Sequence, residues 1–150
     1  MNMNKWFLVT TADERTWPKT NHNILFLGEW CKLFDRKEIW QKYHYKVVDY
    51  HWNNRKNFNE DYHQINLIYE DALVSLSKFL NNFHSETHNK NYWRIVCGPW
   101  LGRFLQGLFD RWTCIKEAYR NYQIEKVICL NNNPEYQASN DYENFSKGVI

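Results

Sequence analysis

The sequence predicts an α/β fold: a Rossmann-like three-layer domain with a mainly parallel, five-stranded sheet. Two observations lead to this prediction. Short apolar runs rich in β-branched and aromatic residues recur along the chain, and segments with helical periodicity lie between them. Strands that alternate with helices form parallel sheets through right-handed crossovers. A chain of 150 residues has the length of a single domain and can bury a substantial core.

Five apolar runs are predicted to be strands, because each is stopped by polar residues, glycine or proline. They cover residues 6–10, 24–27, 46–50, 93–97 and 125–130. We expect residues 1–130 to form the Rossmann-like domain. The polar residues 131–150 are expected to be a tail, or the start of a linker to a second domain that this chain lacks.

Two long helices are predicted, over residues 60–83 and 99–121, and both are expected to pack on the sheet. In each segment apolar residues recur with a period near 3.6, and polar residues occupy the other face. Pro99 suits a first helical position, where its missing N–H is not needed. Gly102 and Gly107 are interpreted as positions that let the second helix pack close to the sheet.

Composition and charge exclude several classes of function. The net charge is +2 with acids and bases mixed along the chain, so there is no electrostatic footprint for nucleic acid. Charged residues interrupt the longest apolar stretches, which excludes a membrane span. The first apolar run is too short for a signal peptide. A cytoplasmic protein is therefore expected.

Metal binding and disulfide bonding are not expected. Cys31, Cys97, Cys114 and Cys129 show neither a C-x-x-C motif nor zinc-ligand spacing, so we interpret them as reduced apolar filler. His84 and His88 have the spacing of one helix face, but they lie where the helix is predicted to end. Neither a metal nor another cofactor is predicted.

Candidate substrate-binding residues follow four of the predicted strands, at the edge of a parallel sheet where ligands bind. Aromatic faces combined with a few charged, hydrogen-bonding groups suit a sugar or a nucleotide. The alternative is that these tryptophans pack loops onto the sheet. The candidate binding residues are Arg15, Trp17, Trp30, Trp52, Gly98 and Trp100.

Three residues of the same edge, Asp13, Glu29 and His51, are candidates for a catalytic base. Asp13 comes directly after the first strand, and nearby Arg15 is expected to lower its pKa and keep it ionised. Glu29 follows Gly28, which would let backbone approach a substrate. A histidine such as His51 titrates nearest to neutral pH without help. An equally open interpretation is that Asp13 only caps its turn and pairs with Arg15.

Four segments together resemble a bacterial family: TTADERTW (10–17), FLGEWC (26–31), YHW (50–52) and YWRIVCGPWLGRFLQGLFDRW (92–112). The family comprises transferases encoded in O-antigen and surface-carbohydrate gene clusters. The resemblance, over residues 7–122, implies a sugar transferase of two-domain, GT-B-like layout in a chain several times longer. This chain would then be the amino-terminal, acceptor-side part or a truncated gene product. The donor would be a nucleotide-activated sugar, bound by a carboxyl-terminal domain beyond Ile150.

Two other functions stay open on the sequence. The chain could be a stand-alone module that binds a sugar or nucleotide without chemistry. It could also be a flavodoxin-like regulatory domain, because Asp13 and Glu14 resemble the acidic pair of a receiver domain. Against that reading, the predicted fourth and fifth strands lack the hydroxyl residue and the lysine that a receiver domain needs.

Overall fold

A computed structural model describes residues 5–19 and 22–130. The chain divides into two compact units. We call Met1–His51 with Trp112–Ile150 the sheet unit, and Trp52–Arg111 the helical unit. The tail predicted over residues 131–150 lies outside the described residues.

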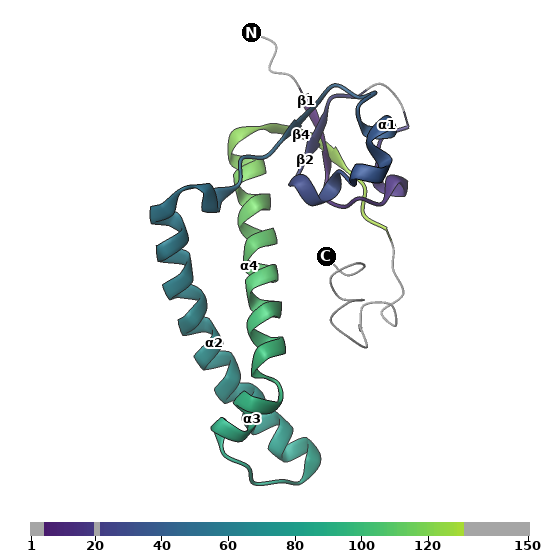
Figure 1. The fold of residues 1–150 in the computed structure, drawn as a ribbon. Helices are drawn as coiled ribbons and strands as arrows, with labels where there is room; N and C mark the ends of the chain where they lie inside the picture. The colour runs from purple at the N-terminus through teal and green to yellow at the C-terminus, as the bar shows by residue number, and fades with distance from the viewer. Residues whose placement is uncertain (1–4, 20–21, 131–150) are drawn as a thin grey trace. The chain divides into compact units, whose positions relative to one another are not determined.

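The sheet unit contains a four-stranded, all-parallel sheet (Figure 1). Phe7 of β1 pairs with Ile24 of β2, and Ile24 pairs in turn with Tyr45 of β3. The α/β class is therefore confirmed, with a sheet that is compatible with a Rossmann-like fold. Along the chain, the strands are β1 (Lys5–Val9), β2 (Ile24–Phe26), β3 (Tyr45–Val47) and β4 (Gln123–Val127). In the sheet, they lie side by side in the order β3-β2-β1-β4.

The two central strands form most of the core of the sheet unit. All three residues of β2 and the last four of β1 are buried, which is typical of strands covered on both faces. The edge strands β3 and β4 contain only half-buried and exposed residues. Cys114 and Ala118 of helix α4 (Gly98–Asn121) belong to the same buried cluster, so the carboxyl-terminal half of this helix packs in the core.

Short helical segments connect the first three strands. The 3-10 turn Glu14–Thr16 follows β1. Two further 3-10 turns, Glu29–Cys31 and Phe34–Arg36, follow β2 and lead into α1 (Lys37–Trp40). The 3-10 turn His51–Asn53 follows β3. These turns hold most of the candidate catalytic residues close to strand ends.

The helical unit consists of α2 (Arg55–His84), α3 (Lys90–Val96) and the first part of α4 (Figure 1). The side chain of Asn54 accepts hydrogen bonds from the N–H groups of Lys56 and Asn57, an arrangement that starts α2. Both long predicted helices are confirmed as helices. The prediction that the first of them packs on the sheet was wrong, because the apolar residues of α2 belong to the core of the helical unit. The buried core of this unit is small and joins one residue from each helix: Leu73, Trp93 and Leu101.

The prediction of a strand over residues 93–97 was wrong, because this segment is helix α3. The side chain of Asn89 accepts a hydrogen bond from the N–H of Tyr92 and starts the helix. Within the helix Trp93 is buried, whereas Ile95 and Val96 are 80% and 58% exposed. A run that reads as a buried strand thus has only one buried residue. The described sheet therefore has four strands, where five were predicted.

The surface of the helical unit carries several large apolar side chains. Phe83 is 70% exposed and stacks on Phe79, with ring centroids 5.9 Å apart. Trp100 is 52% exposed and stacks on Phe104 at 5.2 Å. Within residues 5–19 and 22–130, no helix combines the length and the hydropathy required to cross a membrane.

Candidate functional site

The strand order places a topological switch point beside β1. The chain adds β2 and β3 on one side of β1, then returns to add β4 on its other side. In open parallel sheets, ligands bind beyond the carboxyl ends of the strands at such a point. A ligand site is therefore expected at the segment that follows β1.

A surface hollow of about 420 Å³ lies at this segment. One wall is formed by the turn after β1, including Asp13, Glu14 and Arg15. The other wall comes from the segment after β2, including Asp35 and Arg36. Three carboxylates and two guanidinium groups thus surround a hollow of a size suited to a small polar ligand.

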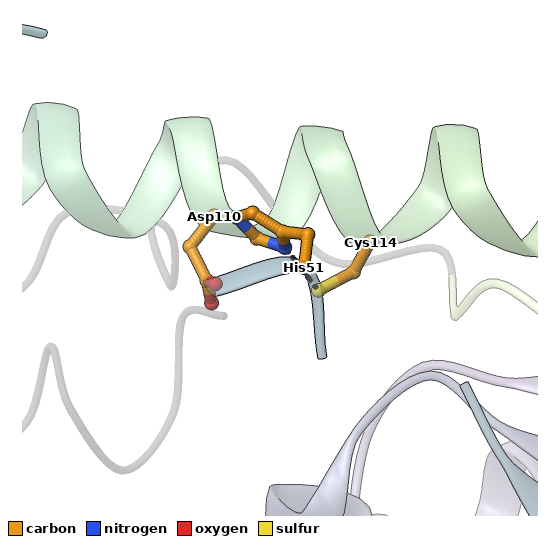
Figure 2. Close-up of side chains that lie close together, drawn as sticks. All are labelled: His51, Asp110 and Cys114. Carbon is orange, nitrogen blue, oxygen red and sulfur yellow. Dashed lines mark hydrogen bonds between the residues drawn. The ribbon is translucent and has the colours of Figure 1, made fainter. Parts of the chain in front are cut away.

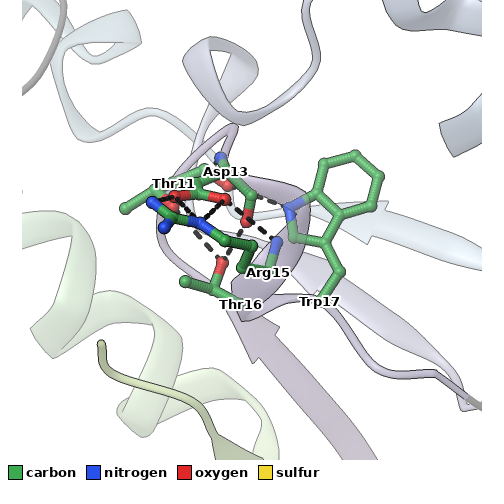
Figure 3. Close-up of polar contacts among 5 residues, drawn as sticks. All are labelled: Thr11, Asp13, Arg15, Thr16 and Trp17. Carbon is green, nitrogen blue, oxygen red and sulfur yellow. Dashed lines mark hydrogen bonds and ion pairs between the residues drawn. The ribbon is translucent and has the colours of Figure 1, made fainter. Parts of the chain in front are cut away.

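Hydrogen bonds between neighbours fix the turn after β1 (Figure 3). Asp13 accepts a hydrogen bond from the N–H of Arg15 at 3.0 Å, which caps the 3-10 turn. The hydroxyl of Thr16 donates to the carbonyl oxygen of Asp13 at 2.7 Å. The N–H of Asp13 donates to Oγ1 of Thr11, and the indole N–H of Trp17 donates to the carbonyl of Thr11. The wall of the hollow is therefore built from its own local sequence.

Arg15 and Asp13 form a two-pronged ion pair. Nε of Arg15 lies 3.0 Å from Oδ1 and 2.9 Å from Oδ2 of the carboxylate, and Nη2 also donates to Oδ2. Hydrogen bonding from the Arg15 side chain lowers the pKa of Asp13, with a smaller opposing effect of burial. The carboxylate is therefore ionised at neutral pH, in agreement with the expected effect of Arg15.

The second wall contains a partner that sequence reasoning missed. Nε and Nη2 of Arg36 lie 2.9 Å and 2.7 Å from Oε1 of Glu14. This pair joins two segments that are 22 residues apart and crosses from the β1 side to the β2 side. Because no local spacing pattern links an arginine to a glutamate over that distance, the sequence carried no signal for the pair.

Glu29 and Trp30 lie in the turn after β2, outside the group of described residues that lines the hollow. The exposed carboxylate of Glu29 forms an ion pair at 3.0 Å with Lys32, whose side chain is only 10% exposed. The indole N–H of Trp30 donates to the carbonyl of Thr10 just beyond β1. A Cβ at Gly28 would lie 1.9 Å from the Trp30 ring. The glycine therefore makes room for this indole, which accounts for its presence without a substrate.

Trp17 is a core residue. Its side chain is 4% exposed and packs edge-on against Phe26 and Tyr43, with centroids 5.3 Å and 6.2 Å away. The interpretation that tryptophans near strand ends pack loops onto the sheet fits Trp17. A role in binding would be limited to supporting the turn at Asp13 through its bond to Thr11.

His51 and Cys114 meet inside the sheet unit. Nδ1 of His51 lies 3.7 Å from Sγ of Cys114 on α4, and both residues are buried (Figure 2). Asp110, also drawn there, stands one helical turn before Cys114 and pairs with Arg111 at 2.6 Å. The filler interpretation of the cysteines agrees with buried Cys31 and Cys114, but Cys97 is half-buried and Cys129 is exposed.

The remaining candidates belong to the helical unit. Trp52 donates its indole N–H to Asp61 at 2.9 Å. Gly98 faces the hydroxyl of Tyr69, which would lie 2.5 Å from an added Cβ. Trp100 is half exposed against Phe104. Gly102 was expected to let α4 pack close to the sheet, but an added Cβ there would lie 3.7 Å from Tyr69 of α2, and the closest approach to α2 is at Gly98.

Comparison with models of protein families identifies the family of this chain. The family model described as LIC12162 family transferase matches residues 6–149, nearly the whole chain. The chain belongs to the LIC12162 family of transferases. The matched range includes every wall residue of the hollow and every candidate site residue. Searches of curated proteins and of solved structures gave no significant match.

Proposed function

We propose that this member of the LIC12162 transferase family is the amino-terminal, acceptor-side portion of a sugar transferase of bacterial surface polysaccharide or O-antigen biosynthesis. Its donor is a nucleotide-activated sugar, held by a further domain, and its place of action is the cytoplasm. The observation that carries the proposal is the hollow at the carboxyl ends of β1 and β2, in a chain of a transferase family.

The lining of the hollow suits an acceptor sugar. Carboxylates accept hydrogen bonds from sugar hydroxyls, and guanidinium groups donate to sugar oxygens. Both kinds of group line this hollow, and the Asp13–Arg15 and Glu14–Arg36 pairs hold them in place before a ligand arrives. Such preorganised groups reduce the entropy that binding removes.

The proposed chemistry requires a base near the acceptor hydroxyl. Asp13 lines the hollow and is ionised, so its carboxylate is in the correct form to accept a proton. The lowered pKa of Asp13 makes it a weaker base. The acceptor hydroxyl would also have to replace one of the hydrogen bonds that Arg15 donates to the carboxylate. Glu29 and His51 stay as the second and third candidates for the same role.

A binding module without chemistry is the alternative, and the same ion pair favours it. Both carboxylate oxygens of Asp13 already accept hydrogen bonds from Arg15. A carboxylate that is permanently occupied in this way would orient a ligand and take no proton. The two functions therefore differ in whether the pair opens when acceptor binds.

The proposal is tested by mapping sugar binding with NMR on the isotope-labelled chain. Titration with hexoses and N-acetylhexosamines should shift amide resonances of the two walls of the hollow, and Asp13→Asn should weaken the binding. Asp71→Asn is the matched control, because Asp71 is an exposed aspartate of α2. Binding that is unaffected by Asp13→Asn, or shifts confined to other surfaces, would exclude this hollow as the acceptor site.

A further inference from the structure

The helical unit contains a second concave site, with a volume of about 570 Å³. α2, α3 and α4 all contribute to it, and glycine and proline at the start of α4 form part of its surface. This groove is independent of the hollow at the sheet and does not figure in the proposed transfer reaction. Its polar lining residues are Asn66, Tyr69, Arg94, Arg103 and Gln106.

The lining of the groove is rich in hydrogen-bond donors. The two guanidinium groups can only donate, whereas the two amides and the phenol can donate and accept. No carboxylate is among the described residues that line it. The hollow at the sheet differs in this respect, because three carboxylates line it. A donor-rich lining suits a ligand that carries several acceptor oxygens.

Arg94 is held in position within this lining. Its Nη1 and Nη2 donate to the two carboxylate oxygens of Glu70 at 2.6 Å and 2.8 Å, and its guanidinium stacks over Tyr69 at 5.7 Å. Lys90 reaches the same carboxylate at 3.0 Å. Two cations therefore share one anion, and this trio has a net charge of +1.

A glycine keeps the surface of the groove open. A Cβ at Gly98 would collide with the Tyr69 hydroxyl at 2.5 Å, so packing alone requires that glycine. A Cβ at Gly102 would be 3.7 Å from the Tyr69 ring, an ordinary contact distance. Alanine would fit there and favour the helix, so packing does not account for Gly102. Its effect is to leave space beside Tyr69 in the groove.

We propose that this groove binds a phosphate-bearing ligand. Phosphate oxygens can accept hydrogen bonds from the donors that line the groove, and guanidinium groups bind phosphate through two parallel hydrogen bonds. The phosphate could belong to a soluble phosphate ester or to a lipid headgroup. The lipid source would use Ile95, Val96 and Trp100, which are exposed and adjoin the lining residues Arg94 and Pro99 in sequence.

Pyrophosphate is the soluble probe, titrated into the labelled full chain at 150 mM salt. Saturable shifts at the groove are expected, with Arg94→Gln weakening the affinity at least tenfold. Glu70→Gln should strengthen it severalfold, because the carboxylate no longer competes for Arg94. A variant that merely loosens the fold would weaken binding instead. Arg120→Gln is the control, because Arg120 is an exposed arginine of α4 that does not line the groove.

Vesicles test the lipid source. Binding to phosphatidylglycerol vesicles but not to zwitterionic phosphatidylcholine vesicles, reduced at least tenfold by Arg94→Gln, would support the phosphate of an anionic lipid headgroup. Pyrophosphate shifts without vesicle binding would support a soluble ligand. The proposal is overturned if neither probe binds, or if Arg94→Gln and Arg120→Gln have equal effects. Neither result bears on sugar binding at the hollow, which is measured separately.

Discussion

Arg15 donates hydrogen bonds to the carboxylate of Asp13 from both its side chain and its backbone N–H. Nε lies 3.0 Å from Oδ1 and 2.9 Å from Oδ2, and the N–H of Arg15 donates to Oδ1 at 3.0 Å. Asp13 therefore serves as the cap of a turn and as one half of an ion pair, and it also lines the hollow at the sheet.

Asp13→Ala should lower the free energy of unfolding by about 1 kcal/mol, because the turn loses its cap. Asp13→Asn should lower it by less, because the amide oxygen can still accept from the N–H of Arg15. Chemical denaturation of both variants measures the difference. Equal losses for alanine and asparagine would show that the charge, rather than the cap, stabilises the turn.

Two glycines should respond oppositely to alanine. Gly28→Ala places a methyl group 1.9 Å from the Trp30 ring and should cost about 1–3 kcal/mol as the indole is displaced. Gly102→Ala meets nothing closer than 3.7 Å and should add up to ~1 kcal/mol, since alanine favours a helix. Thermal unfolding of both variants tests the pair. Trp30→Ala should make the effect of Gly28→Ala smaller in the double variant.

Glu70 should make stability depend on pH below 5. Hydrogen bonds from Arg94 and then Lys90 lower its pKa to about 2 from the ordinary value of 4.5. A carboxylate with a lowered pKa stabilises the fold above its unfolded pKa, and this contribution is lost as the pH falls from about 4.5 towards 2.

The measurement for Glu70 is the urea midpoint between pH 5 and pH 2. Glu70→Gln should flatten the dependence of the midpoint on pH. Glu60→Gln is the control, because Glu60 is an exposed glutamate of the same helix in a longer pair with Lys56, at 3.8 Å. An unchanged pH profile in Glu70→Gln would mean that solvent already screens the Arg94 pair in the folded state.

Thiol reactivity should follow the burial of the four cysteines. Cys129 is exposed and should react with Ellman's reagent first. Cys97 should react more slowly, because burial raises the pKa of its thiol. Cys31 and Cys114 are buried and should react only on unfolding. Cys129→Ser should remove the fast phase, and a fast phase that survives would place a second thiol at the surface.

The central strands and the long helices could be predicted because their signals are local. β1 and β2 are apolar runs buried on both faces, and α2 has a clear helical period. Edge strands were less exact: β4 is Gln123–Val127, whereas residues 125–130 were predicted. An edge strand buries little, so its apolar pattern fixes its bounds poorly.

Segment 93–97 and the second wall of the hollow could not be predicted in the same way. Ile95 and Val96 have strand propensity but stand exposed on α3, where the cap at Asn89 and the burial of Trp93 favour a helix. Arg36 reaches Glu14 only because β1 and β2 are neighbours in the sheet. The sequence located Asp13 and Arg15 at a strand end, and tertiary structure added the opposite wall of the hollow.

Sugar transfer by the intact gene product tests the central proposal most directly. Turnover with a nucleotide-activated donor would be measured for Asp13→Asn, Glu29→Gln and His51→Ala, beside Asp71→Asn as control. Loss of the general base should lower turnover by ~10²–10⁴-fold in one variant that stays folded, with Asp13→Asn the first expectation. Near-normal turnover in all three variants would contradict the proposal that this portion of the chain supplies the base.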